Sequence, residues 1–396
     1  MRVVHLGKFY PSHRGGIESH LELLCRGLGR ALEVEVIVAN GSNTTVVEDD
    51  RGVAVRRLAC IGNFRSAPLC PTIVREIRRV RADLIHLHMP NPLVAIAFLL
   101  SRNAAPLIVS WHSDIVRQRL LGRLIAPLQR IVVGCAAALI ASSPNYLDGS
   151  PTLASNRSRV QVIPYGIDQR EFARPHDYSA VAAIRRRYGE RIVLAVGRLV
   201  YYKGFDYLIR AMREVDGRLL IVGEGPLQAS LKEAAAAADV SDRVHFLGDL
   251  DRPALIDHYH AADIFTLPSI ARSEAFGIVQ LEAMAAGKPI INTRLDSGVP
   301  FVSRDGETGL TVEARSAPAL AQALNRLFAN PELRARFGAA AAQRVAREFN
   351  AELMVNRTLE LYRQVLARSP MAPRLVSESR TSDTASPRSS RQAWRR

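Results

Sequence analysis

Cysteine is scarce in this sequence, and long apolar runs are absent. The 396 residues include four cysteines, with no CxxC pair and no metal-ligand spacing: Cys25, Cys60, Cys70 and Cys135. This pattern argues against a disulfide framework and against a zinc site. The longest apolar run, at 93–100, is far shorter than the roughly 18 to 20 residues that cross a bilayer, and the apolar start is too short for a signal peptide. We therefore expect a cytoplasmic protein without a membrane-spanning segment.

Acidic residues are fewer than basic ones, and the basic excess is uneven. The formal net charge is +15; residues 1–170 carry 21 Lys+Arg against 12 Asp+Glu, residues 171–368 carry 26 against 24, and residues 369–396 carry 6 against 2. A nucleic-acid binder, a protein resting on anionic lipid, and a solubilising surface all fit this distribution. Aromatic residues make up only 6% and are not interleaved with the basic ones, which argues against nucleic acid as a partner.

Short β-branched runs alternate with longer helical patterns, which is typical of parallel βαβ units. The predicted strands form two series, at 2–7, 33–40, 83–89, 106–113, 138–143 and 160–166, and then at 191–199, 218–225, 243–250, 262–269 and 288–293. We predict an α/β fold with two Rossmann-like domains whose parallel sheets face each other across a cleft.

The domain boundaries follow from the same pattern. We expect a first domain at 1–170 and a second at 171–350, joined around the polar, aperiodic segment that starts at residue 168. A helix at 351–368 is predicted to pack back on the first domain. The tail at 369–396 is rich in Ser, Arg and Pro without apolar periodicity, and we expect it to be disordered.

In open parallel sheets, ligands bind at the carboxyl ends of the strands. Gly15 and Gly16 follow the first predicted strand and precede a helix, so the backbone can approach a ligand and the helix N-terminus can face an anion; a plain flexible turn is the alternative. Arg198 and Lys203 follow a strand of the second series, where paired cations suit a diphosphate. The chain has only four lysines against 49 arginines, which favours a specific role for Lys203 over a solvated surface.

Three further strand ends carry polar or turn residues. Gly223 lies in a Gly-Glu-Gly-Pro sequence that marks a tight turn, and it is expected to shape the floor of a pocket. Asp249 and Asp251 form a DxD pattern; we favour turn or helix-cap roles over a divalent metal and predict no metal site. His112 follows a strand of the first series. A lone histidine is more often structural, but this position faces the expected cleft.

The stretch RSEAFGIVQLEAMAAGKPI, residues 272–290, places Glu274 and Glu282 eight residues apart around an apolar segment. If a helix begins near Gly277, Glu274 lies in the preceding loop and can accept hydrogen bonds from sugar hydroxyls, whereas Glu282 lies inside the helix and can reach a ribose. The N–H groups near Gly277, Ile278 and Val279 would then face phosphates. A capping glutamate followed by an ordinary helical one is the alternative for an isolated pair.

Taken together, these motifs resemble those of the retaining glycosyltransferases of family 4, which have the GT-B fold. The stretch at 272–290 is similar to the E-x7-E signature of that family, and VGRLVYYKGFDYLIRA, RGGIESH and WHSD agree with it. The resemblance covers about residues 1–368. It implies a first domain that binds the acceptor, a second that binds the nucleotide sugar, and closure of the cleft during catalysis.

The resemblance also implies roles for individual residues. Glu282 would hold the ribose, and the catalytic group would comprise Glu274 at the hexose, Arg198 and Lys203 at the departing diphosphate, and His112 near the reacting carbon. The remaining donor-binding positions would supply backbone N–H groups or meet the base: Gly15, Gly16, Gly223, Leu247, Gly277, Ile278 and Val279. No cofactor is implied beyond the nucleotide-diphosphate sugar as co-substrate. Transfer would retain the anomeric configuration without metal.

The best single hypothesis is transfer of a hexose, with mannose from GDP-mannose first, to a polysaccharide or polyprenyl-linked glycan. Alternatives are a nucleotide-sugar 2-epimerase of similar architecture and, from a different class, a basic nucleic-acid-binding protein. The basic amphipathic segment at 115–133, with Arg119, Arg123 and Arg130 near one face, is either a helix lying on the anionic inner face of the cytoplasmic membrane or an ordinary core-facing helix. One departure from the family is that Phe301 follows Pro300, where many relatives have a Pro-Glu pair.

Overall fold

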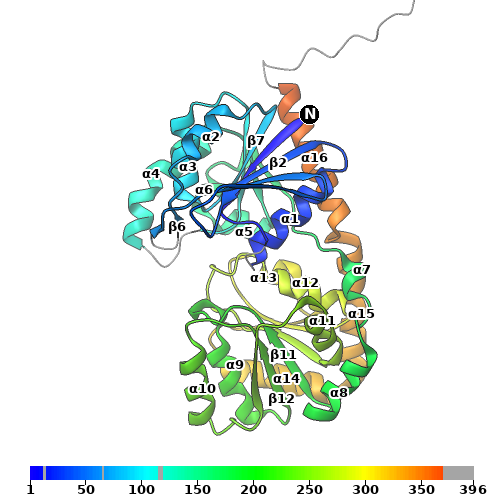
Figure 1. Cartoon of the computed structure of the whole chain (residues 1–396). Coiled ribbons are helices and arrows are strands. Elements are labelled where there is room, and N and C mark those ends of the chain that lie inside the picture. Colours follow the sequence, from blue (N-terminus) through cyan, green and yellow to red (C-terminus); the bar gives the residue numbers. More distant parts are fainter. Residues whose placement is uncertain (12–14, 65–66, 115–118, 369–396) are drawn as a thin grey trace, which may run out of the picture.

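The computed structural model describes residues 1–11, 15–64, 67–114 and 119–368. It forms two α/β domains stacked one above the other (Figure 1). The predicted tail at 369–396 and the start of the predicted amphipathic segment, 115–118, lie outside the described residues.

The first domain is built on an eight-stranded sheet with strand order β10-β9-β8-β7-β1-β2-β4-β3. All neighbouring strands are parallel except β3 and β4, which pair antiparallel. The strands are β1 (Arg2–Leu6), β2 (Glu33–Ala39), β3 (Val46–Asp50), β4 (Val53–Leu58), β7 (Leu84–Met89), β8 (Leu107–Trp111), β9 (Ala136–Ala141) and β10 (Val160–Val162), with a separate pair β5 (Asn63–Phe64) and β6 (Ala67–Pro68).

The second domain is built on a six-stranded sheet with strand order β13-β12-β11-β14-β15-β16, parallel throughout. Its strands are β11 (Ile192–Val196), β12 (Arg218–Val222), β13 (Val244–Gly248), β14 (Ile264–Leu267), β15 (Ile290–Thr293) and β16 (Gly309–Val312). The two sheets confirm the α/β architecture predicted from the two series of strands.

Helices cover both faces of each sheet, which explains why the central strands are buried throughout. Every residue of β7, β8 and β11 is buried. The helices of the first domain are α1 (Gly16–Leu28), α2 (Ile73–Arg79), α3 (Pro92–Ser101), α4 (Arg119–Cys135), α5 (Pro144–Gly149) and α6 (Pro151–Ala154). The linking and second-domain helices are α7 (Gln169–Phe172), α8 (Tyr178–Tyr188), α9 (Phe205–Ala211), α10 (Gln228–Ala237), α11 (Arg252–Ala261), α12 (Ile278–Ala285), α13 (Val299–Val302), α14 (Ala317–Ala329) and α15 (Pro331–Glu348).

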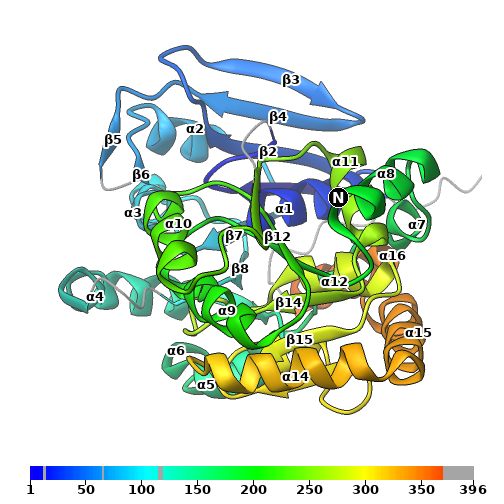
Figure 2. The same cartoon turned by 90° about the horizontal axis from the view of Figure 1, so that it is seen from below.

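The hydrophobic core has one layer on each face of each sheet. In the second domain, one layer is formed with α9, α10 and α14 and the other with α11, α12 and α15 (Figure 2). In the first domain, α3 and α5 contribute to one layer and α1 to the other. The segment predicted to be an aperiodic link contains the short helix α7. Its residue Phe172 is fully buried in a core layer of the second domain.

The last helix, α16 (Ala351–Arg368), returns to the first domain. It runs alongside that domain in Figure 1 and packs against α1. Its residues Met354, Leu361, Tyr362 and Val365 enter the core layer that α1 also lines. Where the chain crosses, the Ile167 N–H donates to the Phe349 carbonyl at 2.9 Å and the Ala351 N–H donates to the Ile167 carbonyl at 3.0 Å. The two crossings between the domains are therefore bonded to each other.

Within the described residues, no helix combines the length and the apolar character needed to span a bilayer. The sulfurs of two cysteines, Cys60 and Cys70, approach to 2.8 Å, although both are free thiols. Their proximity was not evident from their ten-residue separation.

Candidate active site

Strand order reverses once in each sheet, beside β1 and beside β11, so the loops that follow neighbouring strands diverge there and leave a crevice. In the second domain the loop after β11 carries Lys203 and the loop after β14 carries Glu274. Lys203 Nζ lies 2.6 Å from Glu274 Oε2, and the two side chains are 9% and 11% exposed. The Ser269 hydroxyl donates to the same carboxylate oxygen at 3.1 Å. A buried ion pair thus occupies the point where the strand order reverses.

Gly277 determines where α12 begins. Its φ of 76° is in the left-handed region, and a Cβ there would lie 2.6 Å from Leu267 Cδ2, so a larger residue would be strained. The first N–H groups of a helix have no partner inside the helix. Helix α12 begins at Ile278, as the sequence predicted, so the N–H groups of Ile278 and Val279 belong to its first turn.

Helix α1 of the first domain begins opposite α12. A Cβ added to Gly16, the first residue of α1, would lie 3.5 Å from Ile278 Cδ1. Each helix N-terminus carries about half a positive charge. The N-termini of two helices from different domains are therefore close together, and a helix N-terminus favours an anion such as a phosphate.

Glu282 is buried inside α12 and has two partners that sequence reasoning missed. The Tyr259 hydroxyl donates to its Oε2 at 2.7 Å, and Arg252 Nη1 donates to its Oε1 at 3.2 Å. Arg252 also forms a bidentate pair with Glu171, both bonds being 2.7 Å. Burial raises the pKa of Glu282, and the nearby Arg252 opposes that rise. A carboxylate has about four acceptor positions, so Glu282 can accept further hydrogen bonds.

The WHSD segment joins the two domains. Asp114 Oδ1 accepts from Trp111 Nε1 at 2.9 Å and from the Ser150 hydroxyl at 3.0 Å, while its Oδ2 accepts from Arg272 Nη2 at 2.8 Å. Arg272 lies two residues before Glu274. The Asp114 carboxylate of the first domain is therefore bonded to the segment just before Glu274 in the second domain.

Two family models cover most of the described chain. The model described as "Glycosyl transferase 4-like domain" matches residues 15–166, and the one described as "Glycosyl transferases group 1" matches residues 181–344. The chain is 35% identical over 358 residues to "D-rhamnosyltransferase WbpZ" of Pseudomonas aeruginosa, covering 89% of this chain and 93% of that protein. It is 32% identical over 375 residues to "O-antigen chain mannosyltransferase C" of Escherichia coli, covering 92% and 99%.

The chain belongs to the family 4 glycosyltransferases. A sucrose-phosphate synthase from Thermosynechococcus elongatus superposes with a TM-score of 0.81 at 24% identity, covering 93% of this chain and all of that one, which confirms the fold. The resemblance drawn from the E-x7-E stretch is confirmed as well. Neither the epimerase nor the nucleic-acid alternative receives support from these relatives.

Two cations from different domains, Arg198 and Lys8, influence each other electrostatically. Arg198 is exposed at the end of β11. Lys8, directly after β1 in the other domain, has its pKa lowered mainly by burial and further by the charge of Arg198, while Glu18 opposes the shift. Lys8 was not among the predicted site residues. The sequence did contain a signal for Lys8, because it is one of only four lysines and follows the first predicted strand.

The structure places the other residues that the sequence analysis singled out at strand ends and helix starts as follows. A Cβ on Gly223 would collide with the Gly197 carbonyl, and its φ is 123°, so glycine here lets the loops after β11 and β12 pack together. Leu247 is half-buried against the second core. Gly15 is exposed as the N-cap residue of α1. Asp251 of the DxD pattern caps α11, accepting from the Ala254 N–H at 2.9 Å, and so has the capping role that we favoured.

His112 lies deeper than a contact with the sugar would require. It is 3% exposed. Its Nδ1 lies 2.5 Å from the Tyr165 hydroxyl, and its Nε2 lies 2.8 Å from Nδ1 of His88. Both ring nitrogens are thus engaged within the first domain, and the Tyr165 ring in turn contacts Phe276 of the second at 4.8 Å between centroids. A hydrogen bond from His112 to a hexose would require Tyr165 to give way.

The Lys203–Glu274 pair yields a prediction about stability. A buried ion that loses its partner costs about 3 to 5 kcal/mol, so Lys203→Met and Glu274→Leu should each lower the free energy of unfolding by that amount. The double variant should lose clearly less than the sum, because neither charge remains. Urea unfolding of the three variants measures this coupling. The exposed Arg294–Glu313 pair, at 65% and 70% exposure, is the matched control and should show coupling of about 1 kcal/mol at most; additive losses at Lys203 and Glu274 would contradict the interpretation.

The buried histidines of the first domain yield a prediction about pH. Burial lowers the pKa of His5 to about 3 and that of His20 to about 4, and it lowers the pKa of His86, His88 and His112 well below the ordinary value. The unfolded chain binds protons below about pH 6.5 whereas the folded chain does not, so stability is complete above that pH and is lost as the pH falls towards 4. Each histidine contributes about 1.4 kcal/mol per pH unit in this window.

The thermal midpoint should accordingly fall steeply between pH 7 and pH 5. In His86→Gln this fall should be smaller than in the wild type, because one depressed group has been removed. Equal falls in the two proteins would show that His86 is already charged in the folded state.

Proposed function

We propose that this glycosyltransferase moves a hexose of manno configuration, with mannose from GDP-mannose as the first choice, to a surface polysaccharide or its lipid-linked precursor. The two curated relatives transfer mannose and D-rhamnose by name, and D-rhamnose is 6-deoxymannose. The name of one relative also places its product in an O-antigen chain. These names support the sugar class and the acceptor class.

The observation that carries the proposal is the concentration of positive potential at the crevice. Helix α1 begins in contact with Ile278, the first residue of α12, Lys203 lies at the end of the loop after β11 and pairs with Glu274, and Lys8 of the first domain is near enough to Arg198 of the second for that charge to lower its pKa. A nucleoside diphosphate gains negative charge as it leaves the sugar, so preorganised donors at this point lower the barrier for bond cleavage. These groups can supply that stabilisation by themselves, which supports a metal-independent reaction.

Retention follows from a proposed same-face transfer. The bond between the anomeric carbon and the diphosphate oxygen breaks, the acceptor hydroxyl oxygen bonds to that carbon from the same face, and its proton moves to the departing phosphate oxygen. Glu274 is held by Lys203 and Ser269, and Asp114 by Arg272 and Ser150. Both carboxylates are thus committed to partners, which supports a reaction without a covalent intermediate on the protein.

The donor proposal is tested by thermal shift with GDP, UDP, ADP and dTDP sugars, including GDP-mannose and GDP-D-rhamnose. A ligand at 100 times its dissociation constant stabilises the protein by about 2.7 kcal/mol. We expect the guanosine donors to raise the melting temperature most, and Glu282→Gln to abolish most of that shift because an amide accepts fewer ribose hydrogen bonds. Glu313→Gln, an exposed residue of the same domain, should respond like the wild type. Equal shifts for all nucleotides, or an unchanged shift in Glu282→Gln, would contradict the proposed site.

NMR of the product's anomeric proton tests retention.

We further propose that the face formed by α2, α3 and α4 rests on anionic lipid, which would bring the crevice to a lipid-linked acceptor. Three apolar side chains on it are exposed, Ile96 by 39%, Leu100 by 58% and Ile131 by 55%. Exposed arginines accompany them on the same helices or just beyond their ends: Arg75, Arg78, Arg79, Arg102 and Arg130. Apolar contact together with basic charge is what anchors a protein at an anionic interface. The side chains of 119–125 lie outside the described residues, so Arg119 and Arg123 are not part of this argument.

Sedimentation with phosphatidylglycerol vesicles tests this face. The wild type should sediment with anionic vesicles and remain in the supernatant with phosphatidylcholine. Leu100→Ser combined with Ile131→Ser should reduce sedimentation, whereas Tyr178→Ser, at a residue that is 70% exposed in the second domain, should not. If both variants sediment like the wild type, another surface binds the lipid.

A further inference from the structure

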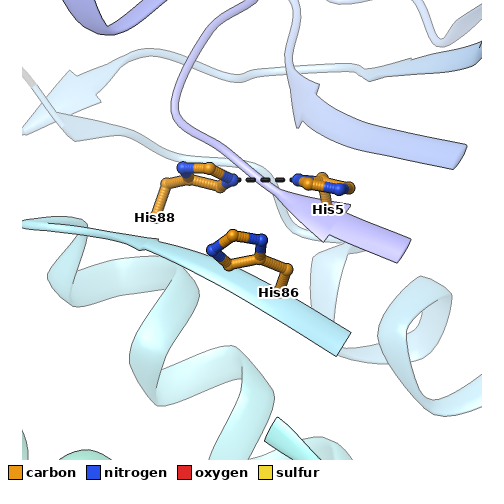
Figure 3. Close-up of side chains that lie close together, drawn as sticks. All are labelled: His5, His86 and His88. Carbon is orange, nitrogen blue, oxygen red and sulfur yellow. Dashed lines mark hydrogen bonds between the residues drawn. The ribbon is translucent and has the colours of Figure 1, made fainter. Parts of the chain in front are cut away.

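A continuous chain of hydrogen bonds runs through the first domain to His112. It begins at the Ser110 hydroxyl, 2.7 Å from His86 Nε2, and continues from His86 Nδ1 to the Tyr362 hydroxyl at 2.6 Å. The same hydroxyl lies 3.3 Å from His5 Nε2, and His5 Nδ1 lies 3.0 Å from His88 Nε2 (Figure 3). His88 Nδ1 then meets His112, which meets Tyr165. All seven side chains are at most 7% exposed.

Sheet register brings these residues together. His5 of β1 is paired with His86 of β7, and His88 of β7 with Ser110 of β8. Residues two apart on a strand point to the same face, so His86 and His88 both face the layer that α1 and α16 cover. Tyr362 enters from α16, although it is 276 residues from His86. Helix α16 thereby completes a network that ends at His112 and Tyr165.

A metal site is the competing interpretation, because His5, His86 and His88, and likewise His20, His88 and His112, have ring nitrogens within 4.8 Å of one another. The ring orientations argue against it. His86 is stacked on His88 at an interplanar angle of 24°, and His88 and His112 are parallel to within 8°. An imidazole lone pair lies in the plane of its ring, so stacked or parallel rings do not aim at one ion. Hydrogen bonds account for both ring nitrogens of His5, His86, His88 and His112, whereas Nδ1 of His20 has no partner in the described residues.

The run from His5 through His88 and His112 to Tyr165 has only two proton arrangements in which every bond is made and the histidines are neutral. A neutral imidazole donates from one nitrogen and accepts at the other. If His5 donates to His88, then His88 donates to His112 and His112 donates to Tyr165; if Tyr165 donates instead, every bond runs the other way. The tautomer of His112 is therefore not independent, because the residue bonded to its Nε2 sets which nitrogen carries the proton.

We propose that His88 is a positioning residue for His112, fixing its ring orientation and tautomer through the Nδ1 to Nε2 hydrogen bond, with Tyr362 of the C-terminal helix holding the far end of the chain. The proposal rests on the proposed function, since it assigns a partner to the histidine that lies next to the proposed donor site. When Tyr165 gives way to a sugar hydroxyl, His88 keeps the His112 ring in place and determines whether its Nδ1 donates or accepts. His112 then acts as an oriented polar contact.

Two substitutions at His88 separate positioning from packing. An asparagine amide occupies the place of the imidazole Nδ1, and a glutamine amide that of Nε2. His88→Asn therefore keeps a partner for His112 and loses the bond to His5, whereas His88→Gln does the reverse. We expect His88→Asn to retain most of the turnover, and His88→Gln to lose about 100-fold in kcat with little change in the KM for the donor, as misplacement of a reactive group does. Equal losses in both variants, tracking their melting temperatures, would overturn the proposal.

A second readout does not depend on activity. In protein labelled with ¹⁵N-histidine, the ring nitrogen shifts report the tautomer, and the His112 signals are assigned by their loss in His112→Gln. The His112 shifts should change in His88→Gln and stay close to wild type in His88→Asn; identical shifts in both would overturn the proposal, as would a stoichiometric metal ion in the purified protein. If the wild type transfers no sugar, the proposed function fails, while the shifts still decide whether His88 positions His112.

Tyr362→Phe tests the far end with little change in volume. It removes the hydroxyl between His86 and His5, so the His112 tautomer populations should become mixed. Thr358→Val is the matched control, because Thr358 lies on the same helix, is also buried, and donates only to the Met354 carbonyl of its own helix. A mixed His112 signal in the control as well would remove Tyr362 from the chain.

Discussion

In a parallel sheet that grows outward in both directions from an inner strand, the loops on either side of the reversal turn away from each other and leave backbone groups uncovered. This glycosyltransferase has such a reversal beside β1 and another beside β11, and the first domain faces the second across them. The candidate site lies where the reversal in one domain faces the reversal in the other. Gly16 and Gly277 each stand at the start of a helix that follows a strand beside the reversal, and the Gly16 backbone lies in contact range of Ile278, the first residue of α12.

The buried Lys203–Glu274 pair shows how a buried positive charge is compensated at the candidate site. A lone ammonium at this depth would be strongly desolvated, and the carboxylate at 2.6 Å offsets that penalty. Glu282 is held in the same way by Tyr259 and Arg252. A nucleoside diphosphate sugar entering between them would meet groups already oriented by each other, and its phosphates would add the negative charge that the helix N-termini favour. Both carboxylates of the E-x7-E stretch are thus held by partners from the second domain.

Much of this could be predicted from the sequence, for identifiable reasons. The inner strands are apolar runs flanked by turn residues, and the E-x7-E stretch keeps its chemistry within one loop and one helix, so local spacing suffices. The β3–β4 hairpin was missed because β3 is almost wholly exposed and has no apolar periodicity. The partners of Glu282 were missed because Arg252 and Tyr259 belong to a different helix. His5, His86 and His88 gave no signal at all, since their convergence depends on the pairing of β1 with β7 and on a helix more than 250 residues away.

The same distant helix bears on how the two domains communicate. The chain crosses between them twice, at Gly166–Ile167 and at Asn350–Ala351, and the crossings are bonded side by side; a Cβ on Gly166 would lie 2.5 Å from the Asn350 carbonyl. If the domains close, as in the family that this chain belongs to, the motion pivots near this junction. Helix α16 starts at the junction and ends on the first domain, carrying Tyr362 into the histidine chain. A rotation there that displaced α16 would change the distances from the Tyr362 hydroxyl to His86 and His5, and a hydrogen bond weakens steeply with distance and angle. The orientation of His112 is thereby tied to the junction between the domains through bonded groups.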